Sequence, residues 1–293
     1  MDHAAFLSAL PPGVRLALTA RAPGQGLLHL AGHLGALALT GAGIALAVPG
    51  WPLLLPLHGV LLVFLFTLQH ECTHRTPFAS DALCDAAGHV IGALLLNPFL
   101  WFRAFHLAHH RHTNQPGDPE LAFPKPVSRT QFWWHVSGLP LWWGAVRLVF
   151  RLARGGERPP YLTDRTRKRA EAEARMLLAL YALAALSLLV SPLVLWLWVI
   201  PALLGQPFLR LYLLAEHGDC PQVADMFANT RTTLTTAVVR RLAWNMPYHT
   251  EHHVLPTVPF HNLPALHGLI RDHLKVTADG YTAFTRDYLA RRR

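Results

Sequence analysis

The segment WPLLLPLHGVLLVFLFTLQHECTH, residues 51–74, decides the fold of this chain. From Trp51 to Gln69 the segment is almost entirely apolar, and it ends on a short polar stretch that contains His70, Glu71 and His74. About 20 apolar residues in a helix are enough to cross the hydrocarbon core of a bilayer. The segment therefore predicts a membrane span whose end carries side chains able to bind a metal.

Three other apolar runs complete a predicted set of four spans. Pro49-Gly50 separates the first two runs and Ser191-Pro192 the last two, so each pair is expected to form a tight hairpin. With 52% hydrophobic and 15% charged residues, the chain lacks the polar helix faces that a soluble bundle would need. We expect an all-α integral membrane fold with a single domain over residues 1–293. The expected spans are residues 27–48, 51–70, 176–191 and 192–214.

The positive charges indicate how these spans are oriented. No Lys or Arg lies between Arg21 and Arg75, and no charged residue lies between Arg175 and Arg210. All 26 Lys and Arg residues lie away from the two hairpin turns, at the N-terminus, in the long middle segment and toward the C-terminus. By the positive-inside rule these parts face the cytoplasm, where we expect a helical cap. The first apolar run is too long for the core of a cleavable secretion signal.

The net charge of +9 is a weak indication of nucleic-acid binding, because the basic residues are scattered among Trp, Pro and His and form no recognised binding motif. We expect no nucleic-acid partner. The three cysteines, an odd number at or near the cytoplasmic side, indicate no disulfide framework.

Two further segments are expected to lie at the membrane surface. Residues 83–102 are apolar but interrupted by Gly and Pro, which predicts a short helix in the interface or dipping into it. Residues 131–154 combine four Trp residues with Arg147, Arg151 and Arg154, which is typical of an aromatic-anchored surface helix.

Three histidine clusters carry the chemistry. They are HECTH at 70–74, HLAHH at 106–110 and HTEHH at 249–253. Spacings of three and four residues put side chains on one helix face, so each cluster can aim several imidazoles at one point. Neutral imidazole binds Fe, Zn, Cu and Ni. Eight such ligands exceed the three or four that one zinc ion takes from a protein, so the sequence predicts two metal ions.

Two other functions are alternatives for these clusters, a zinc protease and a metal transporter. HECTH alone fits the HExxH zinc-protease motif, with Glu71 as the base that activates water, but a protease has no use for the other two clusters. A membrane protease would also be expected to supply an Asp from a later span, and the last two predicted spans contain none. A metal transporter would need ligands within its spans, whereas these histidines gather at the ends.

The order of the clusters, HX3H then HX2HH then HX2HH after paired apolar runs, resembles the membrane fatty acid desaturase and hydroxylase superfamily. The resemblance extends to WFRAFH at 101–106, AEH at 215–217, WNMPYH at 244–249 and LPTVP at 255–259, and it covers about residues 50–270. It implies a di-iron centre in a cytoplasmic cap above four spans. The implied iron ligands are His70, His74, His106, His109, His110, His217, His249, His252 and His253.

His217 enters this set only through the resemblance, because acyl-CoA desaturases take a histidine from the end of the fourth span. Those relatives also use an Asn one turn earlier, where this chain has Leu213. Asn245 is a possible substitute, and His112 is a further candidate ligand. Side chains expected to orient the ligands are Glu71, Glu216, Glu251, Asp118, Asp225 and Asn229.

The implied reaction uses molecular oxygen and reduced iron to attack a C–H bond of a lipid. Fatty acyl desaturation is the first choice, and hydroxylation or ketolation of a lipid or carotenoid is the alternative. The chain has neither a haem motif of cytochrome b5 nor a ferredoxin-type cysteine set. We therefore expect an external electron donor, ferredoxin-like or cytochrome b5-like, and the excess of Arg favours an acidic one.

Overall fold

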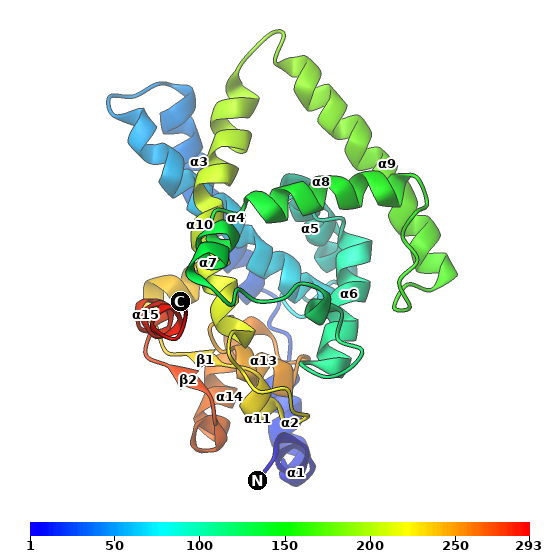
Figure 1. Ribbon diagram of the computed structural model, residues 1–293, viewed down its shortest axis with the longest axis vertical. Coiled ribbons are helices and arrows are strands. Elements are labelled where there is room, and N and C mark those ends of the chain that lie inside the picture. Colours follow the sequence, from blue (N-terminus) through cyan, green and yellow to red (C-terminus); the bar gives the residue numbers. More distant parts are fainter.

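The computed structural model describes residues 1–293 and is mostly helical (Figure 1). The N-terminal half contains α1 (His3–Ala9), α2 (Pro12–Thr19), α3 (Gln25–Ala45), η1 (Trp51–Leu53), α4 (Leu54–His74), α5 (Asp81–Leu94), α6 (Phe99–His112), η2 (Pro119–Ala122), α7 (Arg129–Val136) and α8 (Leu139–Ala153). The C-terminal half contains α9 (Asp164–Ser187), η3 (Leu195–Val199), α10 (Ile200–His217), α11 (Met226–Asn229), β1 (Thr232–Thr233), α12 (Ala237–Leu242), α13 (His249–Val254), η4 (Phe260–Asn262), α14 (Leu263–Ile270), η5 (Arg271–His273), β2 (Thr277–Ala278) and α15 (Tyr281–Ala290).

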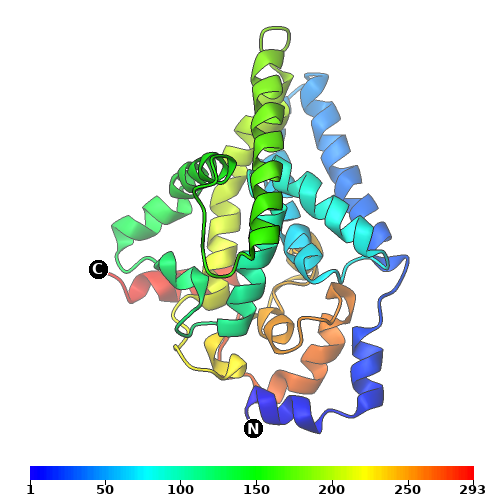
Figure 2. The same cartoon turned by 90° about the vertical axis from the view of Figure 1, so that its right-hand side faces the viewer.

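Two helical hairpins extend toward the same end of the molecule. The turn between α3 and α4 and the turn between α9 and α10 both lie toward the top of Figures 1 and 2. Three helical segments are long and apolar enough to cross a membrane, namely Gln25–Ala45, Trp51–His74 and Leu195–His217. They correspond to the expected spans at 27–48, 51–70 and 192–214.

The expected span at 176–191 is not among these three. Helix α9 begins much earlier, at Asp164, because the Thr163 hydroxyl accepts a hydrogen bond from the backbone of Thr166 and caps the helix. Its first half is charged and is stabilised by pairs such as Arg167–Glu171, 2.8 Å apart. Only the part after Arg175 is apolar, and its dozen helical residues reach about 18 Å at 1.5 Å per residue, against a hydrocarbon core of about 30 Å.

The helix expected over residues 83–102 is two helices. α5 and α6 meet at a bend of 106° and together form a further candidate span, broken or re-entrant. Asn97, at the bend, exchanges hydrogen bonds with Gln69 of α4 at 2.9 Å in each direction. Glu173 of α9 accepts the backbone N–H groups of Phe99 and Leu100 and so caps the start of α6. The bend turns α6 back along α4, toward the histidine end of that helix.

The surface helix expected over residues 131–154 is also divided. Gly138 adopts a φ of +72°, a conformation that glycine tolerates best, and it separates α7 from α8. Gln206 packs so closely against Gly138 that an added Cβ would meet it at 2.4 Å.

Helices α4 and α10 form the centre of the molecule and touch through glycine. A Cβ on Gly59 would lie 2.0 Å from the carbonyl oxygen of Pro201, and one on Gly205 would lie 2.2 Å from the carbonyl oxygen of Gly59. Small residues at such crossings let two apolar helices pack backbone to backbone. This contact brings the ends of the two helices, His74 and His217, to the same side of the molecule.

The C-terminal elements close that end. β1 and β2 pair in parallel, with Thr232 opposite Thr277. Trp244, Leu263 and Leu266 are fully buried in the core that packs around α13. Helix α13 is thereby held between the ends of α4 and α10.

Candidate metal centre

All nine histidines of the expected ligand set come together at one place. They lie on four helices, at the ends of α4 and α10 and along α6 and α13. Eight of them are buried and His74 is half-buried. The distances between their ring nitrogens divide them into two groups.

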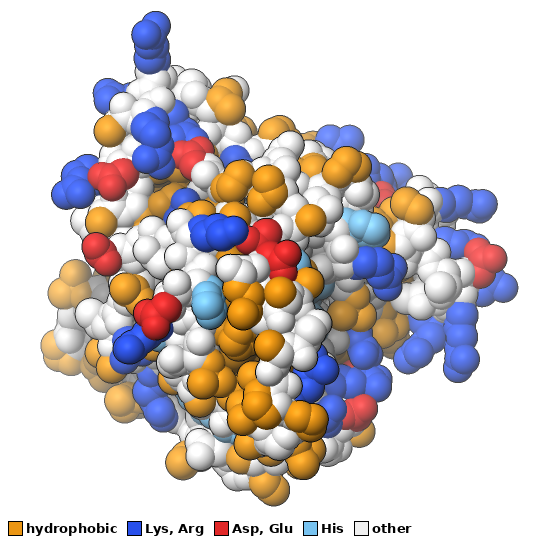
Figure 3. Space-filling model, turned by 90° about the horizontal axis from the view of Figure 1, so that it is seen from below, with side chains coloured by type: hydrophobic (Ala, Val, Ile, Leu, Met, Phe, Trp, Pro, Cys, Tyr) orange, Lys and Arg blue, Asp and Glu red, His pale blue; other side chains and the backbone are white.

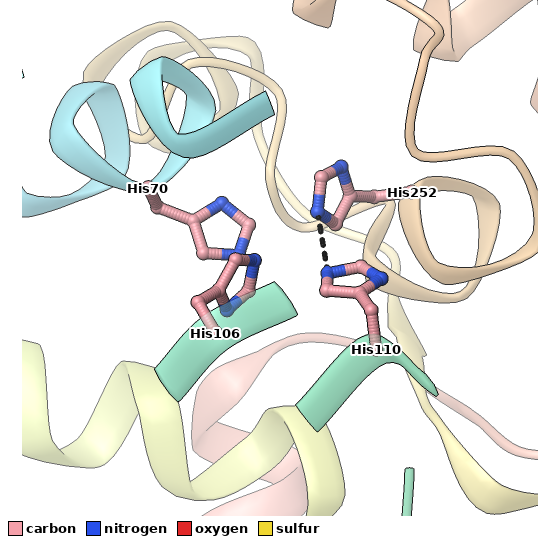
Figure 4. A group of neighbouring side chains, drawn as sticks. All are labelled: His70, His106, His110 and His252. Atoms are coloured by element: carbon pink, nitrogen blue, oxygen red, sulfur yellow. Dashed lines mark hydrogen bonds between the residues drawn. The ribbon is translucent and has the colours of Figure 1, made fainter. Parts of the chain in front are cut away.

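The first group consists of five residues from α4, α6 and α13. Figure 4 shows four of these side chains with their rings turned toward one another, and one ligand atom of each lies within 4.8 Å of the others. His74 joins them through a distance of 2.9 Å between its Nε2 and the Nε2 of His106. The first group is His70, His74, His106, His110 and His252.

The second group consists of four residues from α6, α10 and α13. The Nε2 atom of His217 lies 3.1 Å from the Nε2 atoms of both His109 and His249. The Nε2 atom of His253 lies 3.1 Å from that of His249. The second group is His109, His217, His249 and His253.

The hydrogen bonds behind the second group determine where its lone pairs point. His109 donates from Nδ1 to Asp118 at 2.9 Å, and His217 donates from Nδ1 to the carbonyl oxygen of Asn229 at 3.3 Å. A neutral imidazole has one N–H, so the Nε2 atoms of both rings carry bare lone pairs. Two lone pairs facing each other at 3.1 Å repel unless a cation lies between them.

The spacing fits such a cation. An imidazole nitrogen lies about 2.1 Å from a bound zinc ion, and two such ligands at right angles are therefore about 3.0 Å apart. The distances between neighbouring Nε2 atoms in both groups are 2.9 to 3.1 Å and match this separation.

Burial favours the neutral form of three of these imidazoles. It lowers the pKa values of His249, His252 and His253, all on α13, well below the ordinary value for histidine. A neutral ring is the form that binds a metal. The donor set therefore fits two ions that accept nitrogen ligands.

Three of the side chains expected to orient ligands lie beside a ligand ring, and one of them, Asp118, is hydrogen-bonded to it. Asp118 contacts His109 as described, Glu216 lies 3.5 Å from Nδ1 of His249, and Glu71 lies 3.5 Å from Nδ1 of His252. Asn229 also acts here, but through its backbone carbonyl.

The other two have different partners. Glu251 contacts His267 and Thr232, and Asp225 contacts His3 and Lys275. None of Glu71, Glu216 and Glu251 forms an ion pair with an arginine.

Other candidates lie outside the two groups. His112 packs beneath Gly117, and the amide of Asn245 donates to the carbonyl of Phe260 at 3.0 Å, so neither belongs to the donor set. Leu213 is half-buried against the core. Two single histidines within the spans, His33 and His58, contact backbone carbonyls of neighbouring helices.

The sequence analysis missed three residues that support the site. Thr113 donates to the carbonyl of His109, and its hydroxyl therefore accepts from Nδ1 of His253 at 3.1 Å. Glu120 approaches His109, and Glu173 caps α6. An Asp-Pro-Glu run so soon after HLAHH was the available signal for Glu120; nothing in the pattern pointed to Glu173.

Aromatic side chains lie beneath the first group, on the side of the spans. Phe64 and Tyr212 are buried and meet edge to face, with ring centres 5.3 Å apart. Phe66 packs against Phe102 at the same separation. Phe208 is 52% exposed on the outer face of α10.

Fold and site together define a class of helical proteins in which apolar helices end at a paired cluster of buried histidines. A family model described as fatty acid desaturase matches residues 45–285, and the chain belongs to this family. The match favours neither the zinc protease nor the metal transporter.

Curated relatives agree with this assignment. The chain is 25% identical over 243 residues to an sn-1 oleoyl-lipid 12-desaturase of Synechocystis sp., which covers 73% of this chain and 66% of the relative. It is 34% identical over 119 residues to a protein of the same name from Picosynechococcus sp., covering 34% of each. It is 31% identical over 111 residues to a Delta(12) fatty acid desaturase of Calendula officinalis, covering 38% of this chain and 29% of the relative. The chain thus spans less than two thirds of the length of these relatives.

Proposed function

We propose that this chain is an oxygen-dependent acyl desaturase, an oxidoreductase that introduces a C=C bond into the acyl chain of a lipid. The observation that carries the proposal is the pair of histidine groups with Nε2 atoms about 3 Å apart, within a chain of the desaturase family. The relatives described above are named as desaturases that act on oleoyl-lipid or fatty acid, which favours desaturation over hydroxylation.

The nine histidines would hold two iron ions. The five histidines of the first group would hold one ion, and the four of the second group would hold the other. Reduced iron and oxygen supply an oxidant strong enough to remove hydrogen from an unactivated methylene, which redox-inert zinc does not. The fit rests on neutral imidazoles, on lone pairs that converge, and on spacings that suit one ion in each group.

The residues of the chain position this chemistry. Asp118 keeps the proton of His109 on Nδ1, so that Nε2 stays free for a metal. Burial of eight of the nine histidines excludes bulk water from the ligands. The apolar surface around Phe64 and Tyr212 is suited to an acyl chain that enters from the lipid side.

For the membrane arrangement we propose two hairpins that enter the bilayer from the cytoplasm, with both termini and the histidine groups on the cytoplasmic side. α9, with its short apolar part, would be the outer helix of the second hairpin. Figure 3 views the end opposite the hairpin turns, where Lys and Arg are prominent around the rim, with Asp and Glu among them. This distribution agrees with the positive-inside rule. The test is a cysteine introduced at Gly50, and labelling of this cysteine only from the cytoplasmic side would contradict the proposed orientation.

The same basic end would receive an external electron donor of acidic character, either ferredoxin-like or cytochrome b5-like. Association steered by charge weakens with salt. Turnover by purified protein with substrate and NAD(P)H alone would refute the separate donor.

The deciding experiment is product analysis. Purified protein in lipid, supplied with iron, a reduced ferredoxin, labelled oxygen gas and a lipid that carries an oleoyl chain, is expected to yield an acyl product lighter by two hydrogens. The label should appear in water only. Recovery of the label in an alcohol or ketone, without an alkene, would transfer the chain to the hydroxylase branch.

A further inference from the structure

The two histidine groups are unequal. The first has five imidazoles and the second has four. The position one turn before His217, from which a polar side chain could complete the second group, holds Leu213. A fifth ligand for the second group would therefore have to come from another part of the chain.

Glu120 is such a side chain. Its Oε1 atom lies 3.9 Å from Nε2 of His109, the ring nitrogen that faces the other members of the second group. Two ligands about 2.1 Å from one ion are separated by about 3.0 Å at right angles and by about 4.2 Å when opposite. The distance of 3.9 Å between Oε1 of Glu120 and Nε2 of His109 falls within this range.

The position of Glu120 is fixed by the same carboxylate that orients His109. Oδ1 of Asp118 accepts from Nδ1 of His109 at 2.9 Å and from the backbone N–H of Glu120 at 2.8 Å. Oδ2 of Asp118 accepts from the backbone N–H of Asn114 at 2.7 Å. Asp118 thus ties the short helix η2, which carries Glu120, to the end of α6.

The two oxygens of Glu120 have different surroundings. Oε2 accepts from the ammonium of Lys125 at 3.2 Å, whereas Oε1 faces His109. Oε1 is thus the oxygen that is available to the second group.

We propose that Glu120 supplies a carboxylate ligand to the ion held by His109, His217, His249 and His253. This inference rests on the proposed di-iron function. It makes the first site all-nitrogen and the second site mixed nitrogen and oxygen. A carboxylate adds a negative charge that imidazole lacks and favours harder cations, so the two irons would differ in electronic environment.

The test compares Glu120→Gln, which is nearly isosteric, with Lys125→Ala, which removes the ion-pair partner but keeps the carboxylate. Protein loaded with the Mössbauer isotope of iron is examined for iron per chain and for its quadrupole doublets. Wild type is expected to show two irons and two distinguishable doublets. Glu120→Gln should change one doublet alone and weaken iron binding at that site at least about tenfold, while Lys125→Ala should leave both doublets and the iron content unchanged.

Two results would overturn the assignment of Glu120. One is a Glu120→Gln variant with the iron content and both doublets of wild type. The other is a Lys125→Ala variant that reproduces the Glu120→Gln spectrum, since Glu120 would then act only through its ion pair. Wild-type protein that binds a single iron would instead refute the di-iron function itself, and the inference with it.

Discussion

The two histidine groups differ in how the protein holds their rings. In the second group, the Nδ1 atoms of His109, His217 and His253 are bonded to Asp118, to the carbonyl of Asn229 and to Thr113. In the first group, neither nitrogen of His70 has a hydrogen-bond partner, and Nδ1 of His110 and of His252 has none, whereas in the second group only Nδ1 of His249 has none.

This difference separates two ways of building a metal site. Three of the four rings in the second group are oriented by hydrogen bonds that exist whether or not a metal is bound. The first group is oriented by the packing of α4 against α6 and by the ion itself. Substitution of the hydrogen-bond partners at Nδ1 should therefore weaken metal binding in the second group. Substitutions that disturb helix packing should weaken metal binding in both groups.

The largest expected effect is the loss of a ligand. His106→Ala in the first group and His217→Ala in the second should each abolish desaturation and lower the iron content from about two to about one per chain, because each ring serves one ion only. Metal analysis of purified protein alongside product formation measures both. A variant that keeps two irons and full turnover would remove that histidine from the site.

The next effect separates the two groups. Asp118→Asn replaces the acceptor that fixes the tautomer of His109, and outer partners of metal-bound histidines typically contribute about 10–100-fold to metal affinity or activity. Iron binding should weaken by that factor at the second group only, as followed by competition with a chelator. Equal loss from both groups would contradict the comparison.

A third prediction concerns a substitution that should weaken metal binding in both groups. Glu173→Gln removes a buried carboxylate that accepts two backbone N–H groups at the start of α6. Leaving such groups poorly paired costs about 1–3 kcal/mol. Thermal unfolding in detergent should show this loss, with equal weakening of iron at the two groups. Asp164→Asn, at a side chain that is 91% exposed on the same helix, is the matched control and should stay within about 0.5 kcal/mol of wild type.

The smallest effect is expected at His112. It lies next to the second histidine cluster in sequence but outside both groups in space. His112→Ala should keep two irons and change turnover by less than about twofold, in a measurement of iron content and rate. Loss of one iron would place His112 among the ligands.

Apolar length and charge predicted much of the fold. Three of the four expected spans correspond to candidate spans within a few residues. The fourth was placed by taking Arg175 as a boundary, but α9 continues through it, because a capped helix with ion pairs between successive turns does not end where its apolar part ends. The breaks at residues 95–98 and at Gly138 depend on the backbone angles of Leu96 and Gly138, which periodicity does not encode.

The site was predicted unevenly for a physical reason. The spacing of histidines on a helix determines which rings share a face. The convergence of the clusters could therefore be predicted from the sequence. How the nine rings divide between two groups depends on the angles between α4, α6, α10 and α13, which are set by tertiary packing. Contacts across the chain, such as Thr113 with His253, depend on the same packing.

The glycine crossing of α4 and α10 has a consequence for the distance between the two ions. Gly59 and Gly205 lie about three helical turns before His70 and His217 respectively, and these histidines belong to different groups. A side chain added at either glycine would push the two helices apart where they cross. Because the helices are rigid, their histidine ends would be displaced as well. The separation of the two histidine groups is thus adjustable from a point that belongs to neither of them.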